Sequence, residues 1–189
     1  MFAGLAYAGG GNRCYWQGGF YETVAPRIGL KPRRVVGASA GAFAMLYTAL
    51  GLGPTVRELV REACLGRTSE VDWPAFRRGG RLFPVGELYE LMLAQLFTAD
   101  RLAALQARAD FLVAVSRPPR FWPLPVAAAL GIGAYQLEKR LRRPVHPTAG
   151  RRLGFVPDLV RIADCATPAE LVAALMASAS VPPFMPGGL

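Results

Sequence analysis

The sequence predicts an α/β fold, and three observations lead to this prediction. Apolar residues come in short runs between Gly and Pro, with helical stretches interleaved. The first run, residues 3–8, ends in a glycine triplet that precedes a helical stretch. Val35 and Val36 lead into a second glycine-rich turn, which is followed by apolar helix formers as far as Gly51. The length of 189 residues fits one domain, 1–189, with a sizeable core.

The charge and the cysteine content limit which partners, metal sites and cellular locations are expected. Lys and Arg number 22 against 13 Asp and Glu, which gives a net charge of +9 that attracts polyanions. An anionic lipid surface is the favoured partner, because no nucleic-acid motif is present; an ordinary solvated surface is the alternative. Cys14, Cys64 and Cys165 lie far apart and His146 is the single His, so no metal site is expected. The odd Cys count and the lack of a signal peptide favour a cytoplasmic location, with peripheral membrane contact.

The first glycine-rich stretch follows a predicted strand at residues 3–8, which we expect to be buried on both faces. Gly9–Gly11 can turn backbone amides inward to bind an anion, or can form a tight structural turn. No Gly-Lys-Ser/Thr follows, and Cys14 occupies the last position of the dinucleotide-binding pattern. Nucleotide binding is therefore not predicted. The residues that follow the loop, 15–27, are predicted to form a helix.

The second glycine-rich stretch, Gly37–Gly41, reads GASAG and matches the pattern G-x-S-x-G. A strand before it and a helix after it are the context in which this pattern holds a Ser in a strained, accessible conformation. The helix would direct its amide dipoles toward developing negative charge. Ser39 is therefore the candidate nucleophile, with a purely structural turn as the alternative.

Between residues 55 and 116 the sequence predicts two helices, a loop and a strand, and none of them carries a functional motif. Helices are predicted over 55–65 and 85–97, a loop over 66–84 and a buried strand over 111–116. The second helix is expected to bury one stripe, made of Leu88, Leu91, Met92 and Leu96.

Residues 121–137 form an uncharged run of 17 residues, which falls short of the ~20 that a membrane-spanning helix needs. Aromatic residues begin this run and four cations follow it: Lys139, Arg140, Arg142 and Arg143. This arrangement is typical of an interfacial anchor or an active-site cap, inserted at about 117–152; ordinary burial is the alternative. Farther on, Thr167 and Glu170 form a capping box that predicts a helix over 168–179.

Three motifs in order resemble the patatin-like phospholipase family, of the bacterial type. They are GGGNR at 9–13, GASAGA at 37–42 and ASASVPPFMP at 177–186. The resemblance implies a three-layer α/β fold with a mostly parallel central sheet and a Ser–Asp dyad. It places the nucleophile at Ser39 and the oxyanion hole at the amides around Gly10, Gly11 and Asn12. The remaining motif positions are Gly9, Arg13, Gly37 and Gly41.

Two departures from the family pattern concern the loop and the base. Cys14 stands where the family usually has Gly, and it could crowd the loop. The family's Asp lies in an Asp-Gly motif shortly after the third motif, whereas no Asp here precedes Gly: Asp72, Asp100, Asp110, Asp158 and Asp164. We therefore expect a domain that is incomplete at its C-terminus and lacks the catalytic Asp. His146, between prolines and arginines, reads as a surface residue and not as the base.

The function that the resemblance implies is a phospholipase A-type lipid acyl hydrolase, a serine esterase acting on phospholipid or another fatty acyl ester. No metal or organic cofactor and no nucleic acid are implied. One alternative is a catalytically inactive module that binds lipid or a protein partner covering the incomplete edge. Another is an acyltransferase or peptidase that uses the same Ser.

Overall fold

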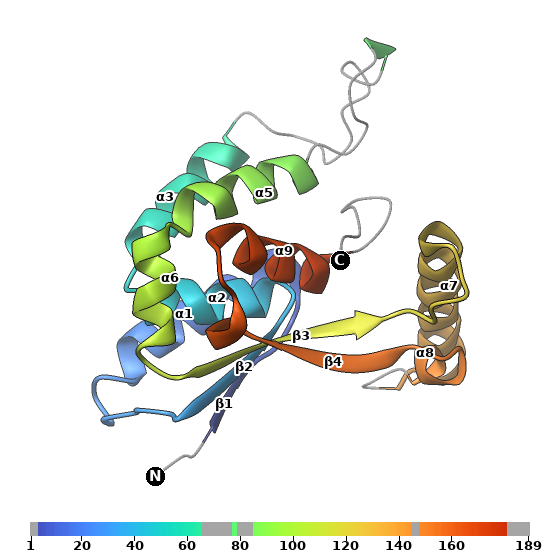
Figure 1. The fold of residues 1–189 in the computed structure, drawn as a ribbon, viewed down its shortest axis with the longest axis horizontal. Helices are drawn as coiled ribbons and strands as arrows, with labels where there is room; N and C mark the ends of the chain where they lie inside the picture. The colour runs from blue at the N-terminus through green and yellow to red at the C-terminus, as the bar shows by residue number, and fades with distance from the viewer. Residues whose placement is uncertain (1–3, 66–76, 79–84, 145–147, 181–189) are drawn as a thin grey trace.

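The protein forms one four-stranded sheet in the computed structural model, which describes residues 4–65, 77–78, 85–144 and 148–180. The strands are β1 (Gly4–Tyr7), β2 (Arg34–Ala38), β3 (Asp110–Arg117) and β4 (Val156–Arg161), and they lie side by side in that order. β1, β2 and β3 run parallel, whereas β4 runs antiparallel to β3 (Figure 1). The predicted α/β fold with a mostly parallel sheet is confirmed.

Helices fill most of the connections between the strands. They are α1 (Tyr15–Val24), α2 (Ala40–Ala49), α3 (Gly53–Cys64), α5 (Val85–Leu96), α6 (Ala99–Gln106), α7 (Leu124–Arg142), α8 (Ala149–Arg152) and α9 (Pro168–Ala179), with short 3-10 turns at η1 (Gly11–Cys14) and η2 (Ile162–Asp164). The helices and the three strands predicted from the sequence are confirmed, with ends that shift by a few residues. Most of the predicted loop at 66–84 lies outside the described residues.

One face of the sheet carries the core, and α2 lies at its centre. Eight consecutive residues of α2, from 41 to 48, are buried, because β2 and β3 pack below the helix and α1 and α9 pack around it. Phe43 makes edge-to-face contacts with Tyr47, Tyr89 and Phe97 at centroid distances of 5.1, 5.7 and 6.3 Å. In Figure 1, α2, α5, α6 and α9 all lie above the sheet. The apolar run after Gly41 is therefore a central helix surrounded by other elements.

The opposite face of the sheet is open, and this corrects the expectation that the first strand is buried on both faces. Leu5 and Tyr7 point into the core, whereas Gly4 and Ala6 are exposed. Leu159 of β4 is 51% exposed on the open face. Successive side chains of a strand point to opposite faces, so a short run of small apolar residues does not by itself reveal whether both faces are covered.

The stripe predicted for the second helix is wrong in part. Leu88 and Leu91 of α5 are 37% and 56% exposed, whereas Leu93 and Leu96 are buried in the core and Tyr89 packs against it. α5 itself carries Leu, Met and Tyr side chains on several of its sides, so more than one apolar stripe can be drawn from its sequence. The packing against α9 selects the stripe that is buried.

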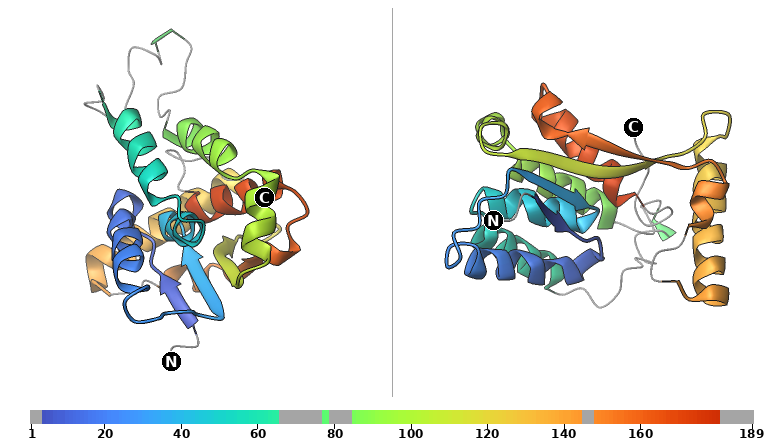
Figure 2. Two further views of the ribbon diagram at one scale, coloured as in Figure 1. Left: turned by 90° about the vertical axis from the view of Figure 1, so that its left-hand side faces the viewer. Right: turned by 90° about the horizontal axis from the view of Figure 1, so that it is seen from below.

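The connection from β3 to β4 carries α7 and α8, which stand at one end of the molecule, away from α1 and α6 (Figures 1 and 2). The carboxylate of Glu138 on α7 accepts hydrogen bonds from the amides of Thr148 and Ala149, both at 2.6 Å. These bonds hold the start of α8 against α7 and keep the pKa of Glu138 below its usual value. Among the described helices, none is long and apolar enough to cross a membrane.

Candidate active site

The G-x-S-x-G stretch forms a sharp turn between β2 and α2. Ser39 adopts φ 53° and ψ −133°, a positive-φ conformation that costs a non-glycine residue on the order of 1–3 kcal/mol. A Cβ on Gly37 would lie 2.5 Å from the Cα of Ala42, and one on Gly41 would lie 2.7 Å from the carbonyl oxygen of Tyr7. Both glycines are therefore required by the close approach of backbone, and they allow α2 to begin directly after Ser39.

The glycine loop after β1 lies against this turn. A Cβ on Gly9 would be 3.3 Å from the Cβ of Ser39 and 3.2 Å from the carbonyl oxygen of Ala38. Gly11 has φ +58°, a conformation that favours glycine, and it begins the 3-10 turn η1. Arg13 donates from Nε to the carbonyl oxygen of Gly10 at 3.4 Å. The structure thus brings together the two motifs that the sequence singled out, although Ser39 lies 30 positions after Gly9 in the sequence.

Two side chains, Gln17 and Cys14, hold the start of this loop. The amide of Gln17 donates to the carbonyl oxygen of Ala8 at 2.8 Å and accepts from its N–H at 2.9 Å. Cys14 donates from Sγ to the same carbonyl oxygen at 3.2 Å and is buried. Cys14 is thus accommodated inside the turn. Burial raises the pKa of its thiol, which disfavours the reactive thiolate.

Ser178 on α9 contacts the backbone of the candidate nucleophile. Its Oγ accepts a hydrogen bond from the N–H of Ser39 at 2.7 Å and donates to the carbonyl oxygen of Ala114 on β3 at 2.6 Å. Ala114 pairs with Ala38, the residue before the turn. Ser178 therefore joins α9, β3 and the turn through a single hydroxyl. It belongs to the third motif of the sequence, but only the fold reveals what its side chain contacts.

Replacing Ser178 by alanine is expected to destabilise the protein by ~1–3 kcal/mol, because the N–H of Ser39 would lose its partner in a half-buried position. The free energy of unfolding in urea measures this loss. Ser178→Thr keeps the hydroxyl and is expected to restore most of it. Equal stability of Ser178→Ala and the natural chain would contradict this role.

Two of the four described Asp residues, Asp110 and Asp158, are paired with arginines. Asp110 is the first residue of β3. It lies at the end of the sheet where β2 and β3 begin, whereas Ser39 follows the end where β2 stops. The carboxylate of Asp110 pairs with Arg161 and Arg34 at 2.6 and 2.8 Å. These arginines hold the pKa of Asp110 below its usual value. Asp158 pairs with Arg117, which lowers its pKa as well. Asp100 and Asp164 lie in the first turns of α6 and η2.

Some of the residues considered from the sequence lie outside the described part of the chain. Asp72, His146 and most of the third motif, residues 181–186, are not described. Within the described residues, no group of three or more His, Cys, Asp or Glu side chains could hold a metal ion. The described arrangement therefore consists of a strained Ser, a glycine loop in contact with it, and the N-terminus of α2.

The chain was compared with protein-family models, with curated proteins and with solved structures. The family model described as patatin-like phospholipase matches residues 5–188, which is nearly the whole chain. Comparison with curated proteins and with solved structures found no significant match.

Proposed function

Because this chain belongs to the patatin-like phospholipase family, we propose that it is a lipid acyl hydrolase whose nucleophile is Ser39. The observation that carries the proposal is the strained, positive-φ backbone of Ser39 with Gly9 of the glycine loop against it. Strain of this kind at a strand-to-helix turn exposes a hydroxyl to a reactant, which a purely structural turn does not require.

In the proposed reaction, Ser39 Oγ attacks the carbonyl carbon of a fatty acyl ester, and the hydroxyl proton passes to a base. The oxyanion would be held by the amides around Gly10, Gly11 and Asn12, which follow the contact between Gly9 and Ser39. Collapse of the intermediate breaks the ester bond and leaves the acyl group on Ser39, while the departing alcohol takes up the proton. Water then attacks the acyl-enzyme, releases the fatty acid and restores Ser39.

A second candidate function is a module that binds lipid or a protein partner without turnover. The observation in its favour is that Asp110 and Asp158 are already paired with arginines, and that no Asp in the sequence precedes Gly. A Ser hydroxyl without a general base loses the typical contribution of such a base, roughly 10²–10⁴ in rate. The two candidates therefore differ in turnover and not in fold.

A fluorophosphonate probe separates the two candidates. If Ser39 is an activated nucleophile, the 189-residue chain becomes covalently labelled, and mass spectrometry maps the adduct to Ser39. The same preparation should release fatty acid from phosphatidylcholine vesicles. If neither labelling nor release occurs, while a longer form of the protein labels under the same conditions, the 189-residue form functions as the non-catalytic module.

We also propose that the α7–α8 region contacts anionic lipid. α7 exposes large apolar side chains: Leu137 is 59% exposed and Leu141 is 75% exposed. The last turns of both helices carry basic residues: Lys139, Arg140, Arg142, Arg151 and Arg152. An exposed apolar surface beside cations matches an interface with anionic headgroups.

Binding to vesicles that contain phosphatidylserine is therefore expected to weaken as NaCl rises from about 0.05 M to about 0.5 M, because salt screens the attraction. Co-sedimentation measures the bound fraction. Arg140→Glu should weaken binding at low salt, whereas Arg27→Glu, on an exposed residue after α1, serves as the charge-matched control. Equal binding to neutral and anionic vesicles would remove the electrostatic part of this proposal.

A further inference from the structure

A cavity of about 460 Å³ lies between the C-terminal half of α2 and the end of the sheet where β2 and β3 begin. Leu5, Val35 and Phe111 form its wall on the sheet. These three residues are neighbours in the register of β1, β2 and β3, and they point to the core face. Met45 and Thr48 of α2 line the opposite side. The inner surface of the cavity is therefore mostly apolar.

This cavity, which we call the α2 cavity, lies apart from the candidate nucleophile. Thr48 comes nine residues after Ser39 along α2, which corresponds to ~14 Å of helix length. Phe111 is the second residue of β3, whereas Ser39 follows the last residue of β2. A ligand in the α2 cavity therefore does not occupy the place of the proposed reaction.

Two exposed cations, Lys31 and Arg108, line the rim of the α2 cavity. They belong to the segments that enter β2 and β3, and these segments lie side by side because the N–H of Asp110 donates to the carbonyl oxygen of Arg33 at 3.0 Å. Nη1 of Arg108 donates to the carbonyl oxygen of Ala49, the last residue of α2. This bond offsets the negative end of the helix, and the guanidinium retains further N–H groups for a ligand.

The positive charge of this rim is not balanced by the cavity itself. No carboxylate is among the described residues that line it. Asp110 lines a separate hollow on the open face of the sheet, where it pairs with Arg34 and Arg161. The buried hydroxyls of Tyr7 and Thr48 are hydrogen-bonded to each other at 3.1 Å, so they already have a partner. The side chains that remain to bind a ligand are therefore apolar groups inside and cations at the rim.

We propose that the α2 cavity binds a small carboxylate that carries an apolar body. The carboxylate lies between Lys31 and Arg108, which supply charge-assisted hydrogen bonds. The apolar body lies against Leu5 and Phe111, where its burial removes apolar surface from water. A mostly apolar cavity with a few polar groups at one side is the usual form of a site for a small molecule. This inference does not depend on the proposed function.

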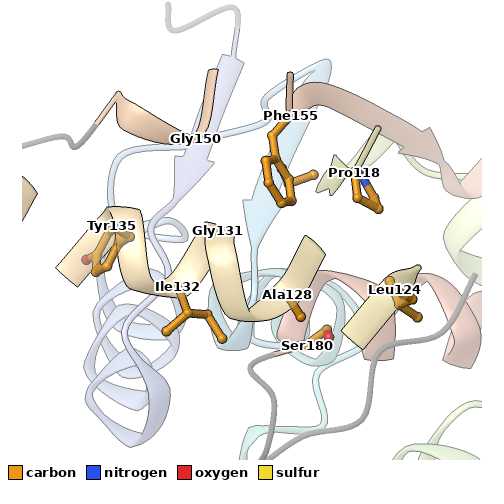
Figure 3. Close-up of a pocket in the computed structure, with 10 residues that line it drawn as sticks. Pro118, Leu124, Ala128, Gly131, Ile132, Tyr135, Gly150, Phe155 and Ser180 are labelled. Atoms are coloured by element: carbon orange, nitrogen blue, oxygen red, sulfur yellow. The ribbon is translucent and has the colours of Figure 1, made fainter. Parts of the chain in front are cut away.

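The pocket along α7 lacks this combination and provides a control site in the same chain (Figure 3). It is smaller, about 270 Å³, and Ser116 and Ser180 line it together with apolar side chains such as Ala128 and Ile132. None of the described residues that line it is charged. A carboxylate is therefore expected to prefer the α2 cavity.

The test measures binding of phenylbutyrate and of phenylbutanol to the full chain by titration calorimetry at about 0.15 M NaCl, where charges act over ~8 Å. The two compounds share an apolar body and differ in the carboxylate. Phenylbutyrate should bind at least ~10-fold more tightly, which corresponds to about 1.4 kcal/mol. The Ser39→Ala chain should bind it as the natural chain does, because Ser39 lies outside the α2 cavity.

Two variants of the cavity have matched controls. Lys31→Glu should weaken phenylbutyrate binding ~10-fold and leave phenylbutanol binding unchanged, whereas Arg27→Glu, on an exposed residue outside the lining, should affect neither. Ala109→Phe places a ring in the α2 cavity and should weaken binding of both compounds. Ala128→Phe places the same ring in the pocket along α7 and should weaken neither.

Three results would overturn the inference. They are the absence of phenylbutyrate binding up to about 10 mM, equal affinity for the acid and the alcohol, and phenylbutyrate binding that responds to Ala128→Phe instead of Lys31→Glu. Circular dichroism checks that each variant is folded. If Ala109→Phe does not fold, Lys31→Glu and Arg27→Glu decide the outcome, because both change exposed side chains.

Discussion

Replacement of Ser39 by alanine is expected to abolish covalent labelling by fluorophosphonate and to lower fatty acid release by a factor on the order of 10³ or more. The physical reason is that Ala keeps the backbone turn between β2 and α2 but removes the only atom proposed to bond to the acyl carbon. Labelling is read on a gel, and release is measured with phospholipid vesicles. Thr23→Ala, which removes an exposed hydroxyl of α1, serves as the control.

A companion variant tests the strain at the same position. Ser39→Gly also removes the hydroxyl, but glycine adopts φ 53° without penalty. We therefore expect Ser39→Gly to be more stable than Ser39→Ala by about 1 kcal/mol in urea unfolding, although both are inactive. Equal stability of the two variants would show that the turn stores no strain. Persistent labelling of Ser39→Ala would show that another residue is the nucleophile.

Replacement of Gly41 by alanine is expected to destabilise the fold by about 3 kcal/mol, at the upper end of overpacking penalties. The added Cβ would lie 2.7 Å from the carbonyl oxygen of Tyr7 and closer still to that of Ala8. Both neighbours are backbone atoms, one in the last residue of β1 and one in the residue after it, so the start of α2 and the end of β1 must move apart. For a domain of this size the loss corresponds to a fall in Tm of ~6–12 °C, measured by circular dichroism.

Gly19→Ala is the matched control for this variant. Gly19 lies inside α1, where an added Cβ meets no atom within 4 Å, and alanine favours the helix by up to about 1 kcal/mol. The control should therefore be as stable as the natural chain or more so. A Gly41→Ala protein with an unchanged Tm would show that β1 and α2 do not pack as closely as the geometry indicates.

The sequence predicted the elements that lie nearest to the site well, because each carries its own local signal. Gly37–Gly41 lies between a β-branched strand and an apolar helix, and Thr167 accepts from the N–H of Glu170 at 3.3 Å as the capping box predicts. These signals depend on a few adjacent residues. They do not require knowledge of what packs against the element.

Elements without such a signal were missed. β4 contains Pro157 and Asp158 within six residues, and its outward side chains are exposed, so it lacks the apolar pattern of a strand. Proline is tolerated there because β4 is paired on one side only among the described strands. Its pairing with β3 supplies the stability that its composition does not indicate.

The contacts around Ser39 show a second limit. The motif at residue 177 onward could be related to the family by resemblance, but the bond from the N–H of Ser39 to Ser178 joins residues 139 positions apart. No sequence pattern predicted the hydrogen bonds by which Gln17 holds Ala8, the residue after β1. Hydrogen bonds of this kind depend on how helices are placed on the sheet, and a single sequence does not encode that placement in any local pattern.

The antiparallel pairing of β3 and β4 places Arg117 directly opposite Val156, so the segment that carries α7 and α8 leaves and rejoins the sheet at neighbouring positions. A connection whose ends are held side by side can lengthen, shorten or change composition over evolutionary time without disturbing the strand register on either side. The turn at Ser39 lies outside this connection, between β2 and α2. Descendants of this sequence can therefore vary the α7–α8 segment while they inherit the turn unchanged.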